Sequence, residues 1–277
     1  MQPFRLTATG YNLSYLPEYI ALRHGFFREQ GLDVTVNIPT PWDGVLDALH
    51  DGTADMALGG IWVPSMYRNR VQDYTVFAQI ANRCPLALLT HGNAKEFKLS
   101  DVPGKTVLMK SGGGASVGLF FKMLLREKGL DERSVDYIQD LDGKMLGDLF
   151  QGGMGDYFVT DNLSALAMVA KNPKVSIAME MVAQGDIPWS VYYPLEKGIA
   201  WVLEHDAESF RNELAELFPN VPVDVAVSVT NGFRRDGMWT STSIPRAGAR
   251  LVDEPLAFEE IVDDAPASAA RSMAGTP

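Results

Sequence analysis

The chain has 277 residues, of which 46% are apolar and 21% charged, and its formal net charge is -11 at pH 7. The length suits one large domain or two medium ones, and the composition is ordinary for a water-soluble globular protein. The acidic balance argues against nucleic acid or an anionic membrane as the main partner. Because Cys84 is the only cysteine, an intrachain disulfide and a cysteine-built zinc site are excluded.

The first residues, MQPFRLTATGYN, do not combine a basic segment, an apolar run and a cleavage site, so no signal peptide is visible. No apolar run approaches the roughly 20 residues of a transmembrane helix. Two locations stay open from these observations. We expect a periplasmic or cell-envelope protein if the chain is a processed form, and a cytoplasmic protein if Met1 is the true start.

Short apolar runs alternate with helical segments in the first part of the chain. Residues 4–10 predict a strand, and residues 15–31 predict a helix with Gly31 as its C-cap. A strand, a helix and a strand follow over 32–38, 41–52 and 54–60. This β-α-β-α-β order predicts a parallel sheet covered by helices on both faces.

The same order of elements then returns. Strand, helix, strand, helix and strand are predicted over 105–110, 115–130, 134–140, 144–153 and 156–161. A repeat of this length predicts two similar α/β lobes. Extended runs over 74–81, 84–92 and 188–193 would cross between the lobes and form a hinge with a cleft, a common place for ligands. Further helices are expected from about residue 195 to residue 253.

Four stretches together resemble one known family. They are YLPEYIALRHGFFREQGLDVTV, DALHDGTADMALGG, GKTVLMKSGGGAS and DYFVTDNLSALAMV. The chain resembles type II periplasmic binding proteins of the alkanesulfonate and thiamine-pyrimidine-precursor group, from about residue 4 to residue 262. The resemblance implies an α/β fold of two similar lobes, each a mostly parallel sheet with helices on both faces, joined by a two-strand hinge. Lobe one would comprise 1–88 plus 190–262 and lobe two 89–189, with 263–277 as a disordered tail.

A glycine-rich turn, SGGGAS, separates a predicted strand from a predicted helix. Glycine lets a ligand approach the main chain, and a helix N-terminus suits an anionic group. The spacing is no P-loop and only an imperfect dinucleotide fingerprint. The resemblance implies that a ligand head group binds here, at Ser111, Gly112, Gly113 and Ser116.

Other candidates follow the ends of strands, where ligands bind in open α/β sheets. Tyr11 and Asn12 end the first strand, and Trp42, Gly60 and Trp62 surround the next two strand-to-helix turns. Core packing is an equally good explanation for the two tryptophans. Asp161 and Asn162 open a helix, so one of them would cap it, and the resemblance adds a ligand contact. Trp189 is a candidate for the cleft floor.

The resemblance implies a monomeric binding protein that closes around a small organic solute by hinge motion and delivers it to the permease of an ABC importer. The solute would be anionic or heteroaromatic, and we expect no catalytic residue, cofactor or metal. A cytosolic decarboxylase, dehydratase or other non-redox lyase of the same fold is the alternative, and a dinucleotide-dependent oxidoreductase is a third. We expect Cys84 to be a buried, inert thiol.

Overall fold

A computed structural model describes residues 1–61, 63, 74–76, 78–109, 116–139, 141–191 and 196–240. Four expected site residues, Trp62, Ser111, Gly112 and Gly113, lie outside these ranges, as does the expected tail over 263–277. Ser116 lies in a described helix, but its side chain is outside the description.

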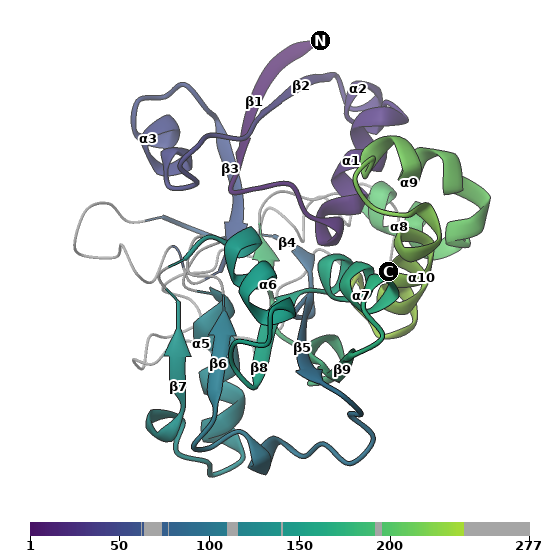
Figure 1. The fold of residues 1–277 in the computed structure, drawn as a ribbon. Coiled ribbons are helices and arrows are strands. Elements are labelled where there is room, and N and C mark those ends of the chain that lie inside the picture. Colours follow the sequence, from purple (N-terminus) through teal and green to yellow (C-terminus); the bar gives the residue numbers. More distant parts are fainter. Residues whose placement is uncertain are drawn as a thin grey trace. The chain divides into compact units, whose positions relative to one another are not determined.

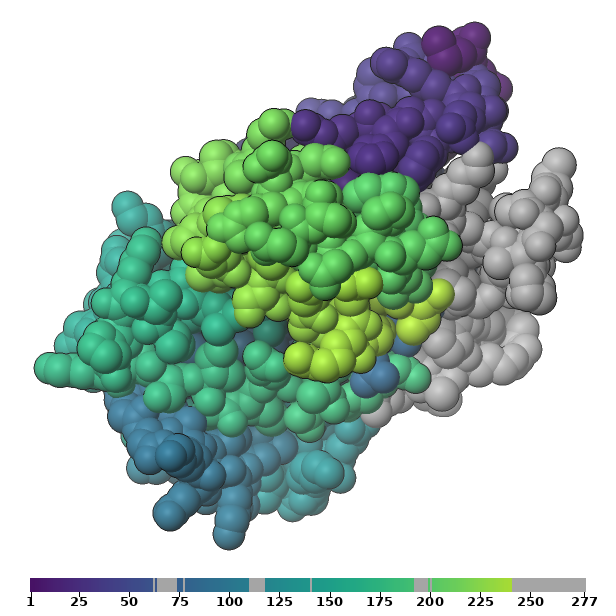
Figure 2. Space-filling model, turned by 90° about the vertical axis from the view of Figure 1, so that its right-hand side faces the viewer, coloured from purple at the N-terminus to yellow at the C-terminus, as the bar shows by residue number. Residues whose placement is uncertain are grey.

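The chain divides into two compact units. Unit 1 comprises Met1–Arg83, Gly185–Asp206 and the chain from Gly237 on, and unit 2 comprises Cys84–Gln184 and Ala207–Asp236. The lobe boundaries expected from the sequence differ slightly at 84–88 and 185–189, and they assign the longer segment 207–236 to lobe one. Helix α10 (Val223–Arg235) packs on α7 (Asn162–Lys171) and on α9 (Arg211–Leu217), which ties this segment to unit 2. Figure 2 shows the exposed surfaces of α9 and α10 in light green to yellow.

Unit 1 contains a mixed sheet of five strands in the order β2-β1-β3-β10-β4 (Figure 1). The strands are β1 (Gln2–Ala8), β2 (Leu32–Asn37), β3 (Met56–Gly60), β4 (Gln79–Ala81) and β10 (Ser190–Val191). Strand β1 is parallel to both β2 and β3, as the sequence predicts. Strand β10 is antiparallel to β3 and β4, so the returning chain makes the sheet mixed.

The helices of unit 1 include one difference from the sequence prediction. They are η1 (Leu13–Tyr15), α1 (Leu16–Arg23), α2 (Phe26–Glu29), α3 (Gly44–His50) and α8 (Glu196–Glu204). The single helix expected over 15–31 is wrong, because the chain breaks it into α1 and α2 at Gly25. Gly25 has a φ of 77°, a left-handed conformation that ends α1 and that glycine adopts without strain.

Unit 2 contains a second mixed sheet, in the order β7-β6-β8-β5-β9. The strands are β5 (Leu86–His91), β6 (Thr106–Met109), β7 (Asp136–Ile138), β8 (Tyr157–Asp161) and β9 (Val175–Glu180). Strand β6 is parallel to β7 and β8, while β5 is antiparallel to β8 and β9. Each sheet thus begins with the second, first and third strands of its half, and the predicted pair of similar α/β halves is confirmed.

Each unit has its own buried core. In unit 2, α6 (Gly143–Gln151) packs on β8. The described part of the unit also contains α5 (Ser116–Glu127) and the 3-10 helices η2 (Leu99–Asp101), η3 (Glu132–Ser134), η4 (Met181–Ala183) and η5 (Ala207–Phe210). In unit 1, the buried Trp239 donates its Nε1–H to the carbonyl of Ser14 at 2.9 Å, which ties the segment after α10 to η1. Within the described ranges, no helix is long and apolar enough to cross a bilayer.

Candidate ligand-binding site

The parallel strands β1 and β3 of unit 1 end at the same edge of their sheet. Leu6 pairs with Met56 and Ala8 with Leu58, and the N–H of Thr9 donates to the carbonyl of Leu58 at 3.0 Å. The residues that follow the two strands therefore share this edge. In open α/β sheets, ligands bind outside the carboxyl ends of the strands. Of the predicted site residues, Tyr11 and Asn12 follow β1 and Gly60 ends β3, so all three belong to this edge.

Tyr11 presents an aromatic ring at this edge. Its side chain is 49% exposed, and its ring stacks on that of Tyr19 with 4.5 Å between centroids and 10° between planes. The Tyr19 hydroxyl accepts a hydrogen bond from the N–H of Asn12 at 3.0 Å. The Asn12 side chain is itself used to cap η1, because its Oδ1 accepts from the N–H of Ser14 at 2.9 Å. These contacts hold Tyr11 flat against α1, where its side chain remains about half-exposed.

The buried Tyr15 connects three elements of unit 1. Its hydroxyl lies 3.3 Å from Oγ1 of Thr9, just beyond β1, and also forms a hydrogen bond with the Ser190 side chain on β10. Burial raises the pKa of Tyr15, which keeps its hydroxyl protonated. This hydroxyl therefore links the end of β1 to β10.

A buried carboxylate, Glu18, lies on α1 between Tyr15 and Tyr19 and is only 1% exposed. Burial raises the pKa of Tyr11, Tyr15 and Tyr19, and the negative charge of Glu18 raises all three further. The tyrosines consequently stay neutral and can donate hydrogen bonds. Sequence reasoning missed Tyr15, Glu18 and Tyr19 as site residues, although an acidic residue within an apolar helical stripe is a signal of a buried polar site.

Glycines allow the ends of β1 and β3 to approach closely. A Cβ added to Gly59 would lie 3.0 Å from Cγ2 of Thr9, tighter than an ordinary contact. Gly60 pairs with Ser190 across the sheet. The two candidate tryptophans that the structure describes differ. Trp42 is half-buried just before α3, whereas Trp189 is buried and its backbone N–H donates to the carbonyl of Ala81 at 2.8 Å.

In unit 2, Asp161 and Asn162 occupy the end of β8 and the start of α7. The Asp161 carboxylate accepts a hydrogen bond from the N–H of Ser164 at 2.9 Å, so the predicted helix cap is confirmed. Asn162 is 4% exposed, and its Oδ1 has no hydrogen-bond partner among the described residues. An unpartnered buried amide oxygen costs free energy, which a donor on a bound molecule would recover.

Cysteine chemistry finds no support in the structure. Cys84 is fully buried at the start of unit 2, and burial raises the pKa of its thiol well above the ordinary value. The expected burial of the thiol is therefore confirmed, and the raised pKa disfavours the reactive thiolate. In the part of the chain that the structure describes, no three His, Cys, Asp or Glu side chains gather in a way that could hold a metal ion.

Comparison with known proteins agrees with this architecture. The model of a family described as NMT1/THI5 like matches residues 12–152. YtlA of Bacillus subtilis (strain 168), which its name provisionally classes as a binding protein, is 24% identical over 253 residues, covering 83% of this chain and 75% of YtlA.

Two solved structures share the fold. The nitrate-binding protein NrtA from Synechocystis PCC 6803 has a TM-score of 0.70 at 12% identity, covering 100% of this chain and 90% of NrtA. The alkanesulfonate-binding protein SsuA from Xanthomonas axonopodis pv. citri, bound to MOPS, has a TM-score of 0.64 at 14% identity, covering 95% of this chain and 98% of SsuA. The likeness confirms the two-lobed α/β fold of type II periplasmic binding proteins.

Proposed function

Because the chain belongs to the NMT1/THI5-like family, we propose that it is a solute-binding protein that takes up a small organic molecule at the carboxyl edges of its sheets. The observation that carries the proposal is the half-exposed ring of Tyr11, held flat on Tyr19 where β1 and β3 end. A flat aromatic surface beside neutral hydroxyls suits an unsaturated or apolar ligand body.

The proposed contacts come from both units. Those in unit 1 are Tyr11, Asn12, Trp42, Gly60, Trp62 and Trp189, and those in unit 2 are Ser111, Gly112, Gly113, Ser116, Asp161 and Asn162. The buried, unpartnered Oδ1 of Asn162 supports a polar contact in unit 2. We therefore assign the polar or anionic head of the ligand to unit 2, where the proposed contacts carry hydroxyl, amide and backbone groups.

The partner and the location follow from the class of protein. Solute-binding proteins of this fold include SsuA and NrtA, named for alkanesulfonate and nitrate. We propose that this chain delivers its solute, as a monomer, to the permease of an ABC importer in the cell envelope. Hinge closure around the solute would signal the loaded state to the permease.

Native mass spectrometry of the purified protein with a panel of sulfonates, aromatic carboxylates and pyrimidines tests the proposal. We expect one compound class to be retained and recovered unchanged from the filtrate. Tyr11→Ala should weaken its affinity about tenfold, because the ligand loses an aromatic contact. Met154→Ala, which removes an exposed apolar side chain before the start of β8, away from the carboxyl edges of the sheets, is the control and should leave affinity unchanged. Turnover of a retained compound would instead establish the lyase alternative.

A further inference from the structure

A cavity of about 180 Å³ lies within unit 1, between α3 and β3. Ala57 and Gly59 are alternate residues of β3, so they face the same side of the sheet. One has a methyl group and the other no side chain, and Val45, Leu46 and Leu49 of α3 border the space beside them. The cavity therefore results from two small residues opposite a helix of larger ones.

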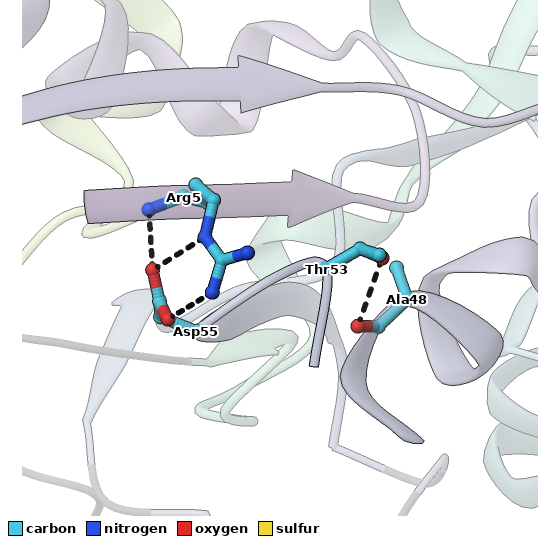
Figure 3. A network of polar contacts seen from close by, with 4 residues as sticks. All are labelled: Arg5, Ala48, Thr53 and Asp55. Atoms are coloured by element: carbon cyan, nitrogen blue, oxygen red, sulfur yellow. Dashed lines mark hydrogen bonds and ion pairs between the residues drawn. The ribbon is translucent and has the colours of Figure 1, made fainter. Parts of the chain in front are cut away.

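The walls of the cavity are mainly apolar, and the charge at its far end is already paired. Asp55 lies there and accepts two side-chain hydrogen bonds from Arg5, from Nη2 at 2.7 Å and from Nε at 3.1 Å (Figure 3). It also accepts the backbone N–H of Arg5 at 2.8 Å. Because the Asp55 carboxylate already has these hydrogen-bond partners, a charged group on a ligand would gain little from contact with it. The mainly apolar walls of the cavity therefore suit an apolar group.

The other end of the cavity lies at the carboxyl edge of the sheet, where we propose that the ligand binds. Thr9, Gly59 and Gly60 line the cavity and also form the carboxyl edge where Tyr11 lies. The apolar part of a ligand could occupy the cavity from this edge while its polar head group is bound outside the cavity. An apolar cavity of about 150 Å³ in another protein holds benzene, so this one has room for a ring of that size.

We infer that this cavity receives the apolar body of the solute. The inference rests on the proposed function and narrows its substrate class to organic molecules that carry a phenyl ring or an alkyl chain of about six carbons. Small inorganic anions such as nitrate would leave the cavity unfilled and are poor ligands for this chain.

Benzene tests the cavity independently of any head group. In the full chain with labelled methyl groups, benzene should shift the methyl resonances of Val45, Leu46 and Leu49. Ala57→Leu fills the space and should abolish these shifts, whereas Ala48→Leu adds the same side chain to α3 away from the lining and should keep them. Leu49→Phe fills the cavity from the helix side and replaces Ala57→Leu if that variant does not fold. Absence of the shifts in the wild type, or their persistence in the filled variant, overturns the inference.

A series from ethanesulfonate to octanesulfonate, and the matching alkanoates, tests the link to the solute by calorimetry. Affinity should rise about fourfold for each methylene until the cavity is full. The rise should disappear in Ala57→Leu and persist in Ala48→Leu. Binding without dependence on chain length overturns the inference and leaves the proposed function standing. If benzene binds but no sulfonate, carboxylate or pyrimidine does, the proposed function fails and the apolar cavity stands.

Discussion

Strands β3 and β8 hold the same place in their two sheets, yet they face very different interiors. Each is the third strand of its half and lies parallel to the first strand. The middle paired position is Ala57 in β3, opposite Thr7, and Phe158 in β8, opposite Leu108. Phe158 is 2% exposed and fills the core beneath α6, whereas Ala57 lines a cavity beneath α3.

This difference shows that the same arrangement of strands can support either a packed interior or an interior with a cavity. Strand order and parallel pairing are the same in the two units, because they depend on alternating apolar segments and short connections. Whether the interior is solid or hollow depends on side-chain size at a few positions of the third strand. Unit 2 is thus a packed support for Asp161 and Asn162, while unit 1 keeps a cavity beside Thr9 and Gly59.

Phe158→Ala tests the packing of the core of unit 2 and has the largest expected effect. The Phe158 ring lies 5.6 Å from that of Phe150 and belongs to the buried core of unit 2. Its removal leaves a void in a close-packed interior, so we expect a loss of about 3–5 kcal/mol in the free energy of unfolding. Denaturant unfolding measures the loss, and hydrogen exchange should locate it in β6 and β8.

Phe26→Ala is the control for this change, because Phe26 is only partly buried on α2 of unit 1. We expect a clearly smaller loss from it. Equal losses would show that the core of unit 2 is no more tightly packed than the edge of unit 1, and the contrast between the units would fail.

Trp239→Phe tests how unit 1 is held together around its cavity. The substitution removes the indole N–H that donates to the carbonyl of Ser14 and leaves that buried oxygen without its partner. We expect a loss of about 1–3 kcal/mol in the free energy of unfolding. Faster hydrogen exchange should appear at η1 and β1. Trp201→Phe, at a partly buried position on α8, should not accelerate exchange there.

Asp161→Ala separates capping from ligand contact in unit 2. Loss of the hydrogen bond to Ser164 should cost about 1 kcal/mol of stability. Asp142→Ala removes the corresponding cap of α6, where the carboxylate accepts from the N–H groups of Lys144 and Met145, and should cost a similar amount. Calorimetry of ligand binding should show weaker affinity for Asp161→Ala alone. Equal affinities would assign Asp161 to capping only.

Much of the frame follows from local patterns in the sequence. Alternating strand and helix periodicities predict both halves, and a polar residue after a strand predicts the cap at Asp161. The sequence does not reveal the break at Gly25, because a helix can contain an isolated glycine and only the φ angle shows that this one ends the helix. Chain order also places 207–236 in lobe one, whereas the packing of α10 on α7 places this segment in unit 2. Such packing between helices far apart in the sequence is not visible in a local pattern.

The site is harder to predict than the frame. Tyr11 and Asn12 are found from their place after a strand, a rule that needs only topology. The role of Glu18 depends on its burial among tyrosines from two elements, which no local pattern reports. The cavity is harder still, because it consists of space that Ala57 and Gly59 leave unfilled.

The smallest expected effect comes from Asp55→Asn, at the end of the cavity beside the start of β3. The hydrogen bonds from Arg5 lower the pKa of the Asp55 carboxyl below its ordinary value of 3.8. A lowered folded-state pKa contributes stability that is complete above the unfolded-state value and is lost as pH falls through the folded-state value. The melting temperature of the wild type should therefore exceed that of Asp55→Asn by a small, constant margin above about pH 5, and the margin should shrink as acid is added. Both side chains reach solvent, so salt should reduce the margin as well. A margin that persists at low pH would mean that the stabilisation by Asp55 does not depend on its charge.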